Sequence, residues 1–364
     1  MRIGLVTKWF NRGQAYVAAH LRTALEELDH ETFVLARPTK DKGPIAGYID
    51  DGGRWDQPNV TIASSWEVPG EEFVSWAAAN RLDAAMFDNS YQFDEVEVLR
   101  ASGIKTIGRF VWEHFGPEHV EPAKRAYDVI YSVTLAEQAR YREFGIESPY
   151  FPWGCHPEFF EVTPNRDPEL VTFYFPGALM GPRKPHRQVI EAFSRAKGDH
   201  LRLLVKAQVD RRTRYLQRAL ERDSRIALIV EDLPHDDHLQ LFADCQVCLG
   251  PSRWEGLGLF LYEAIAVGMP IITNDDPPMN EVVIDGQNGL LVRSKADGTA
   301  DSGIPAFTPD VKDLARAIER IADRAQLERL SAGAVASQAT WSWRHTVDGL
   351  GAMIAAIEHR ITAS

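Results

Sequence analysis

Short apolar segments alternate with helical segments along most of the chain, and this alternation restricts the fold more than any other feature. Five strands are expected in the first half, over 3–7, 32–36, 84–87, 105–110 and 129–133. Four are expected in the second half, over 170–176, 201–205, 226–230 and 241–250, and two more follow a helix within 251–292. Parallel strands need a long crossover between them, which a helix usually supplies. The alternation therefore predicts an α/β protein whose parallel sheets are covered by helices on both faces.

The length of 364 residues predicts two domains of ordinary size. The segment 151–157, with two prolines and a glycine, is the expected junction, and the polar segment 161–169 is the expected linker. We therefore expect Rossmann-like domains over 1–160 and 161–341. Irregular structure is expected over 37–59 and an exposed loop over 293–309, because glycine, proline and polar residues are frequent there.

Composition excludes several classes of protein. The residues are 45% hydrophobic and 25% charged, which is typical of a globular protein, and the net charge of −12 argues against general affinity for nucleic acid or anionic lipid. There is no apolar run of the roughly 18 residues that a membrane span needs. The chain enters a strand almost at once, so no signal peptide is expected. A cytoplasmic location is the simplest expectation.

The three cysteines do not suggest a disulfide framework. Cys245 and Cys248 have the spacing of a metal or redox pair, but no second cysteine or histidine pair lies nearby in the sequence. We interpret them as buried thiols.

The segment Pro251–Val292 carries the most informative chemistry. Gly256 and Gly258 permit positive φ and a close approach of the backbone to a ligand, and a helix is expected to begin near Gly258. Its first N–H groups suit an anion. Glu255 and Glu263 have seven residues between them, and eight helical residues rise about 12 Å. That exceeds the roughly 5–9.5 Å between glycosidase carboxylates. On spacing alone, an ordinary glutamate at the helix N-terminus and a second one facing solvent is the favoured interpretation.

This segment closely resembles the donor-binding signature of the retaining GT-B glycosyltransferases, the large group 1 family with a Glu-x7-Glu pattern. The matching residues are Pro251-Ser252, Glu255-Gly256-Leu257-Gly258-Leu259, Tyr262-Glu263-Ala264-Ile265-Ala266, Gly268-Met269-Pro270, Glu281, Asp285-Gly286, Asn288-Gly289 and Leu291-Val292. One departure is that Pro277-Pro278 replaces the glycine pair that the family often has, which removes two N–H donors.

A second resemblance lies in the segment Gly177–Lys184. The family has Gly-Arg-Leu followed by a lysine, and these two cations neutralise the donor diphosphate. Lys184 matches the lysine, whereas Ala178 occupies the arginine position. Arg183 could supply the missing charge, although adjacent side chains generally point in different directions.

The resemblance implies a nucleotide-diphospho-sugar donor, with a UDP-sugar as the default, bound by the second domain without a metal or a cofactor. Glu263 would accept hydrogen bonds from the ribose and Glu255 would contact the sugar. Lys184, Arg183 and the backbone of Gly256, Leu257, Gly258 and Leu259 would hold the diphosphate. The acceptor, a glycan, a lipid-linked molecule or a small molecule, stays open. Asp275-Asp276 is interpreted as a turn rather than a metal site.

The first domain offers weaker candidates. Gly13 lies at the first strand-to-helix turn, either as an ordinary turn glycine or as a point of close approach to a ligand. Glu113 and His114 follow a strand end and are either structural or, as the resemblance implies for the histidine, near the donor sugar. The lack of a GxGxxG motif disfavours a dehydrogenase. The resemblance also implies that residues 342–364 pack back on the first domain.

Two other functions remain open from the sequence. One is a GT-B enzyme of another class, an epimerase or a phosphorylase, although no motif for a pyridoxal phosphate lysine is recognisable. The other is a two-lobed binding protein without catalysis.

Overall fold

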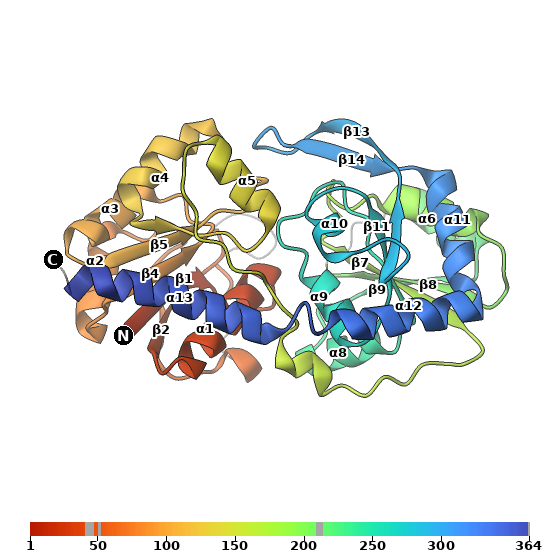
Figure 1. Ribbon diagram of the computed structural model, residues 1–364, viewed down its shortest axis with the longest axis horizontal. Coiled ribbons are helices and arrows are strands. Elements are labelled where there is room, and N and C mark those ends of the chain that lie inside the picture. Colours follow the sequence, from red (N-terminus) through yellow and green to blue (C-terminus); the bar gives the residue numbers. More distant parts are fainter. Residues whose placement is uncertain (41–46, 50–51, 209–213, 363–364) are drawn as a thin grey trace. The chain divides into compact units, whose positions relative to one another are not determined.

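The computed structural model of the protein describes residues 1–40, 47–49, 52–208 and 214–362. The chain divides into two compact units (Figure 1). Unit 1 consists of Met1–Pro152 and Arg344–Ser364, and unit 2 of Trp153–Trp343. The boundary therefore precedes the one predicted after residue 160. The expected linker 161–169 belongs to unit 2, where the Arg166 guanidinium donates to the carbonyls of Ala243 and Val267.

Unit 1 contains a six-stranded parallel sheet with the order β3-β2-β1-β4-β5-β6. Its strands are β1 (Arg2–Lys8), β2 (Glu31–Arg37), β3 (Val60–Ile62), β4 (Ala84–Asp88), β5 (Lys105–Arg109) and β6 (Val129–Ile130). Its helices are α1 (Gly13–Glu27), α2 (Gly70–Asn80), α3 (Phe93–Ala101), α4 (Val120–Ala126), α5 (Leu135–Glu143) and most of α13 (Trp343–Thr362), with short 3-10 turns at Gly53–Trp55 and Pro117–His119. On α13, dark blue in Figure 1, Glu358 approaches the amino group of Met1 to 3.9 Å.

Unit 2 repeats this plan with the strand order β12-β11-β10-β7-β8-β9. Its strands are β7 (Val171–Ala178), β8 (Leu201–Ala207), β9 (Ile226–Val230), β10 (Val247–Leu249), β11 (Ile271–Asn274) and β12 (Gly289–Val292). Its helices are α6 (His186–Arg195), α7 (Arg214–Arg222), α8 (His235–Ala243), α9 (Leu259–Ala266), α10 (Met279–Val282), α11 (Val311–Ala322) and α12 (Arg324–Ser337), with a 3-10 turn at Pro157–Phe160. A separate antiparallel hairpin pairs β13 (Ser294–Thr299) with β14 (Pro305–Pro309).

Both sheets have the doubly wound order of a Rossmann fold, which confirms the α/β prediction of two Rossmann-like halves. The first and fourth strands of each unit are neighbours, β1 beside β4 and β7 beside β10. The chain leaves these two strands toward opposite sides of the sheet, so a crevice forms beyond their carboxyl ends. The loops after β1, β4, β7 and β10 are therefore where ligands are expected.

Two local predictions were wrong. The expected strand 241–250 is the end of α8 followed by a short β10, because Leu239 and Phe242 are buried at helical spacing. The expected loop 293–309 contains the β13–β14 hairpin, in which Ala306 and Thr308 alternate with less buried neighbours. The charged run 210–214 also predicts a helix start; residues 210–213 lie outside the described residues, and α7 begins at Arg214.

Two predicted features agree with the structure. Cys155, Cys245 and Cys248 are unbridged and buried, and burial raises the pKa of the Cys245 thiol to about 12. Among the helices that the structure describes, none is long and apolar enough to cross a membrane.

Candidate functional site

The crevice of unit 2 brings together side chains from two loops. The loop after β7 carries Arg183 and Lys184, and the loop after β10 carries Ser252 and Glu255. The two loops are far apart in the sequence, with 68 positions between Lys184 and Ser252. They meet because β7 and β10 are neighbours in the sheet.

Lys184 is buried at the centre of this group, with 5% of its side chain exposed. Its Nζ lies 2.9 Å from the Glu255 Oε2 and 2.9 Å from the Ser252 Oγ, and 4.5 Å from the centroid of the Phe260 ring. Burial lowers the pKa of Lys184, and the charge of Glu255 partly offsets that effect. The ammonium is thus held at a fixed point by a carboxylate, a hydroxyl and an aromatic ring.

Glu255 accepts from both cations of the group. Its Oε1 lies 3.1 Å from the Arg183 guanidinium, and its Oε2 also accepts from the Ser252 hydroxyl at 3.0 Å. Burial alone would raise the pKa of Glu255, but Arg183 and Lys184 outweigh it and lower the pKa to about 2. Glu255 is therefore ionised at neutral pH. Arg183 differs from Lys184 in being 36% exposed.

Arg183 and Lys184 reach the same carboxylate although they are adjacent. The expectation that neighbouring side chains diverge holds for strands, but residues 181–184 form a turn. At the family's arginine position, Ala178 adopts a φ of +48°, and its carbonyl accepts from the Gln208 amide. Ala178 carries no charge, and the second cation beside Lys184 is Arg183.

Backbone hydrogen bonds fix the two loops to each other. The Arg253 amide donates to the Arg183 carbonyl at 2.8 Å, and the Asn274 side chain donates to the Ser252 carbonyl at 2.9 Å. The Phe307 amide of the β13–β14 hairpin donates to the Arg253 carbonyl at 2.8 Å. The hairpin, which the sequence did not predict, is therefore part of the support of the site.

Helix α9 begins directly beyond Glu255. Its N-cap Gly258 has a φ of +74°, which a residue with a Cβ rarely adopts, and no side chain caps the helix. The predicted backbone donors Gly256, Leu257 and Leu259 lie at this start. Glu255 itself precedes the helix, so the estimate of about 12 Å between the two glutamates does not apply.

Glu263 is the fifth residue of α9 and is half-buried. Burial, followed by the charge of Glu158, raises the pKa of Glu263 to about 8. Its environment is the opposite of that of Glu255, where cations outweigh burial. The two glutamates of the signature thus have different protonation behaviour, consistent with different roles.

Pro277-Pro278 and the acidic pair before it form the turn after β11. The peptide bond between the two prolines is cis. Asp276 accepts from the Ser294 hydroxyl at 2.5 Å, and Asp275 accepts from the Asn280 amide group at 3.1 Å.

The three candidate site residues of unit 1 lie in two different loops of that unit. Gly13 is the exposed first residue of α1, after β1. Glu113 and His114 follow β5, with the Glu113 Oε1 3.6 Å from the His114 Nε2. Glu113 is buried, with 7% of its side chain exposed, whereas His114 is 44% exposed.

Unit 1 also contains a buried ion group that sequence reasoning missed. The Arg109 guanidinium lies 3.0 Å from the Asp88 carboxylate and binds both oxygens of Glu137, at 2.6 and 3.2 Å. Glu137 also accepts from the Val133 amide at 3.1 Å. Asp88 and Arg109 end β4 and β5, so charged residues that close a predicted apolar strand were the available signal.

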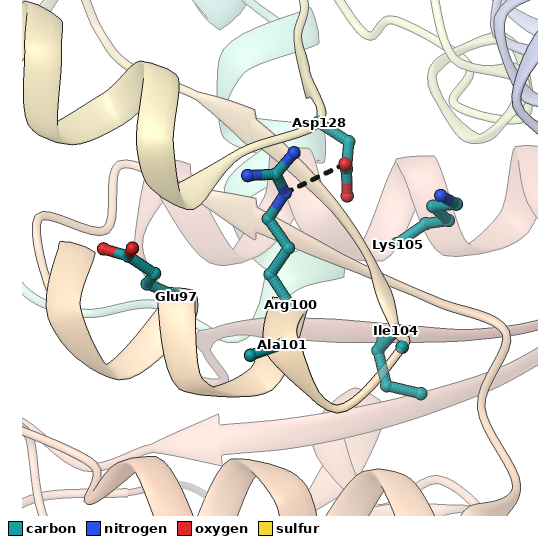
Figure 2. Close-up of a pocket in the computed structure, with 7 residues that line it drawn as sticks. Glu97, Arg100, Ala101, Ile104, Lys105 and Asp128 are labelled. Carbon is teal, nitrogen blue, oxygen red and sulfur yellow. Dashed lines mark hydrogen bonds and ion pairs between the residues drawn. The ribbon is translucent and has the colours of Figure 1, made fainter.

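A cavity of about 360 Å³ lies elsewhere in unit 1 (Figure 2). It is lined by residues of α3, β5 and the adjoining turns: Glu97, Arg100, Ala101, Gly103, Ile104, Lys105 and Asp128. Arg100 donates to Asp128 at 2.9 Å and to the Arg125 carbonyl at 2.8 Å. Because Lys105 begins β5, the cavity is at the amino ends of the strands, opposite to the edge where such sheets bind ligands. We do not assign it to the function.

A comparison with protein families matches residues 158–324 to the model of the glycosyl transferases group 1. This segment contains Arg183, Lys184, Glu255 and Glu263. Residues 158–324 are a group 1 glycosyltransferase segment.

Two relatives are similar over part of the chain. The GtfA subunit of a UDP-N-acetylglucosamine–peptide N-acetylglucosaminyltransferase from Streptococcus pneumoniae is 30% identical over 182 residues, covering 46% of this chain and 36% of that protein. A D-inositol 3-phosphate glycosyltransferase from Nocardia farcinica is 33% identical over 117 residues, covering 32% of this chain and 23% of that protein. The matches thus span about a third or less of these relatives.

Solved structures resemble the whole chain. Sucrose-phosphate synthase from Thermosynechococcus elongatus aligns with a TM-score of 0.70 at 16% identity, covering 100% of this chain and 99% of that chain. Anabaena HepE, solved in complex with UDP-glucose, aligns with a TM-score of 0.71 at 15% identity, covering 99% and 100%. These likenesses show the fold, and with the group 1 segment they confirm the GT-B architecture.

Proposed function

We propose that the protein is a retaining, metal-independent glycosyltransferase that moves a sugar from a nucleotide-diphospho-sugar to an acceptor hydroxyl. A UDP-sugar is the first choice of donor, because solved neighbours include a complex with UDP-glucose. The observation that carries the proposal is the convergence of Arg183 and Lys184 on Glu255 at the switch point of unit 2, inside the group 1 segment.

The charge balance of this group suits a diphosphate. Two cations, Arg183 and Lys184, face one carboxylate, and 36% of the Arg183 side chain is exposed. An incoming diphosphate would take hydrogen bonds from Lys184 and Arg183 and from the amides at the start of α9. Cations fixed where negative charge develops stabilise the departing diphosphate without reorganisation.

Glu255 changes partner in this proposal. Its carboxylate now accepts from Lys184, Arg183 and Ser252. Once the diphosphate engages the cations, the ionised carboxylate is available to accept hydrogen bonds from sugar hydroxyls, since an ionised carboxylate is an acceptor only. Glu263, further along α9, would accept from the ribose.

Retention of configuration is proposed from the resemblance to the group 1 family, and the poor nucleophilicity of Glu255 bears on the route, because it disfavours a covalent intermediate on this residue. A carboxylate whose pKa is about 2, with both oxygens bound to cations, is a weak nucleophile. We therefore favour attack of the acceptor hydroxyl on the same face that the diphosphate leaves, with a phosphate oxygen taking the hydroxyl proton. The acceptor would bind to unit 1, where Gly13, Glu113 and His114 are the candidate contacts. The unbridged thiols support a reducing compartment, the cytoplasm.

Thermal shift with UDP, GDP, ADP and dTDP tests the donor site. A nucleotide at 100 times its Kd adds about 2.7 kcal/mol of stability, so one of the four should raise the Tm of the wild type by several degrees. Lys184→Gln should abolish most of that rise and should reduce donor turnover by roughly 10²- to 10³-fold. Lys105→Gln, at the far edge of unit 1, is the matched control. A wild type that none of the nucleotides stabilises, or a Lys184→Gln variant that responds like the wild type, would show the donor site to be misassigned.

A further inference from the structure

Three cations surround one tryptophan ring in unit 1. The Arg37 guanidinium carbon lies 4.3 Å from the centroid of the Trp66 ring, the Lys8 Nζ 5.1 Å and the Lys40 Nζ 5.7 Å. Trp66 is half-buried. One cation is enough to occupy a tryptophan face, so three cations at one ring need a further reason.

These cations come from the edge of the sheet where a ligand is expected. Lys8 is the last residue of β1, Arg37 is the last residue of β2, and Lys40 lies three positions beyond it. Trp66 follows β3. The carboxyl ends of three neighbouring parallel strands therefore deliver the cluster, beside the switch point between β1 and β4.

Among the described residues, the three cations of the cluster outnumber the acids that act on them. Within the described part of the chain, no ion pair joins Lys8, Arg37 or Lys40 to a carboxylate. The acids of the described residues that act on the cluster are Asp88, which pairs with Arg109 and also acts on Lys8, and Glu67, which acts on Arg37. Arg37 instead donates to the Trp66 carbonyl and to the Gln92 side chain.

Two further observations agree with an excess of positive charge. Burial, and next the charge of Arg37, lowers the pKa of Lys8; Asp88 opposes this effect, and Arg12 and Lys40 add to it. Helix α1 begins four residues after β1 with no acidic residue in its first turn and no side-chain cap. Its amino end adds partial positive charge to the same edge. A chain with a net charge of −12 thus concentrates positive charge at one place.

We infer that Lys8, Arg37 and Lys40 form a subsite for an anionic group, a phosphate or a carboxylate, on the molecule that unit 1 binds, with Trp66 packing against the rest of that molecule. Describing this molecule as the sugar acceptor rests on the proposed function. The binding of the anion itself does not. The inference restricts the open choice of acceptor to acidic ones, such as sugar phosphates and uronic acids.

Arg37 is unsuitable as the first variant, because it is buried and supports the backbone of Trp66. Lys40→Gln is the preferred first variant, because Lys40 is exposed and its replacement should not disturb the fold. Lys8→Gln is the second variant. Lys105→Gln, which removes a cation from the opposite edge of the same sheet, is the matched control.

Calorimetry at low salt with glucose 6-phosphate, glucuronate, inorganic phosphate and glucose tests the subsite, in the presence of saturating nucleotide so that Lys184 is occupied. At least one of the three anions should bind at least tenfold more tightly than glucose. Each of Lys8→Gln and Lys40→Gln should weaken that anion about tenfold, as expected for the loss of a hydrogen bond to a charged group, and Lys105→Gln should not.

Equal affinity for all four probes, or an equal loss in the control variant, would overturn the subsite. If phosphate binds and glucuronate does not, the anion is a phosphate; the reverse result makes it a carboxylate. Nucleotide binding is measured separately and judges the proposed function alone. A protein that binds no nucleotide is tested with the anions in its absence, and the same criterion applies.

Discussion

Each unit holds a buried ion group at the carboxyl ends of its central strands, and the two groups differ in the balance of charge. In unit 1, one cation, Arg109, faces two carboxylates, and its side chain is 2% exposed. In unit 2, two cations face one carboxylate, Glu255, and Arg183 is 36% exposed. Similar strand positions therefore support groups of opposite net charge and different accessibility.

The difference separates a structural group from a binding group. The unit 1 group is closed, because Glu137 engages Arg109 with both oxygens and also accepts from a backbone amide. Because Arg109 is buried and already hydrogen-bonded to both carboxylates, we do not expect this group to bind a ligand. In the unit 2 group, the Arg183 side chain is 36% exposed, so water or a ligand can reach it. Burial of charge alone is a poor guide to function, whereas accessible surplus charge is a better one.

The largest effect is expected from removing Arg109. Arg109→Met leaves Asp88 and Glu137 buried without their cation, which costs about 3–5 kcal/mol. Burial raises the pKa of Asp88 and of Glu137, and Arg109 opposes this effect. The variant therefore removes the charge that stabilises both ionised carboxylates. Urea unfolding of the whole chain measures this cost.

The matched control neutralises the group completely. Asp88→Asn, Arg109→Met and Glu137→Gln together should recover most of the lost stability, since replacing all members of a buried ion group is often close to neutral. Thermal response to the nucleotide should persist in the triple variant. A loss of less than 1 kcal/mol in Arg109→Met, or a triple variant less stable than the single one, would contradict the closed-group interpretation.

A smaller effect is expected from Arg183. Arg183→Gln removes the exposed cation and leaves the Lys184–Glu255 pair in place, so stability should change by about 0.5 kcal/mol or less. Affinity for the diphosphate should fall about tenfold, the loss of one charged hydrogen bond. Titration with UDP and with uridine separates the two effects, because uridine lacks the diphosphate. If affinity for UDP and uridine fell equally, Arg183 would not act on the diphosphate.

Sequence patterns predicted most of the fold because the strands are apolar and their order follows from alternation. The strands β1, β2, β4, β5, β7, β8 and β9 were placed within a few residues. The β13–β14 hairpin was missed because β13 is polar and exposed and β14 is only five residues long, with a proline at each end. Strand β3 was missed because it is short and half exposed. Neither element carries enough apolar residues to produce a periodic signal.

The candidate site was predictable only in part. Lys184 and Glu255 stand in recognisable motifs, but their pairing, and the link through Ser252, depends on β7 lying beside β10. The direction of Arg183 depends on a turn that no local pattern specifies. Lys8, Arg37 and Trp66 are far apart in the sequence and match no motif, so only the parallel pairing of β1, β2 and β3 reveals them.

The smallest effect is expected from Glu263, and it contrasts the two glutamates of the signature. Because the folded pKa of Glu263 is about 8, well above the ordinary value of 4.5, its contribution to stability is complete below pH 4.5 and is lost as the pH rises through 8. Glu263→Gln cannot ionise, so it should become more stable than the wild type by about 1 kcal/mol between pH 5 and pH 8, a modest gain because partial exposure lets water screen the charge. Urea unfolding at both pH values measures it, with the exposed Glu161→Gln as control. If the stability of the wild type and of Glu263→Gln changed equally with pH, Glu263 would ionise as easily in the folded protein as in the unfolded one. The contrast between the two glutamates would then come only from the cations around Glu255.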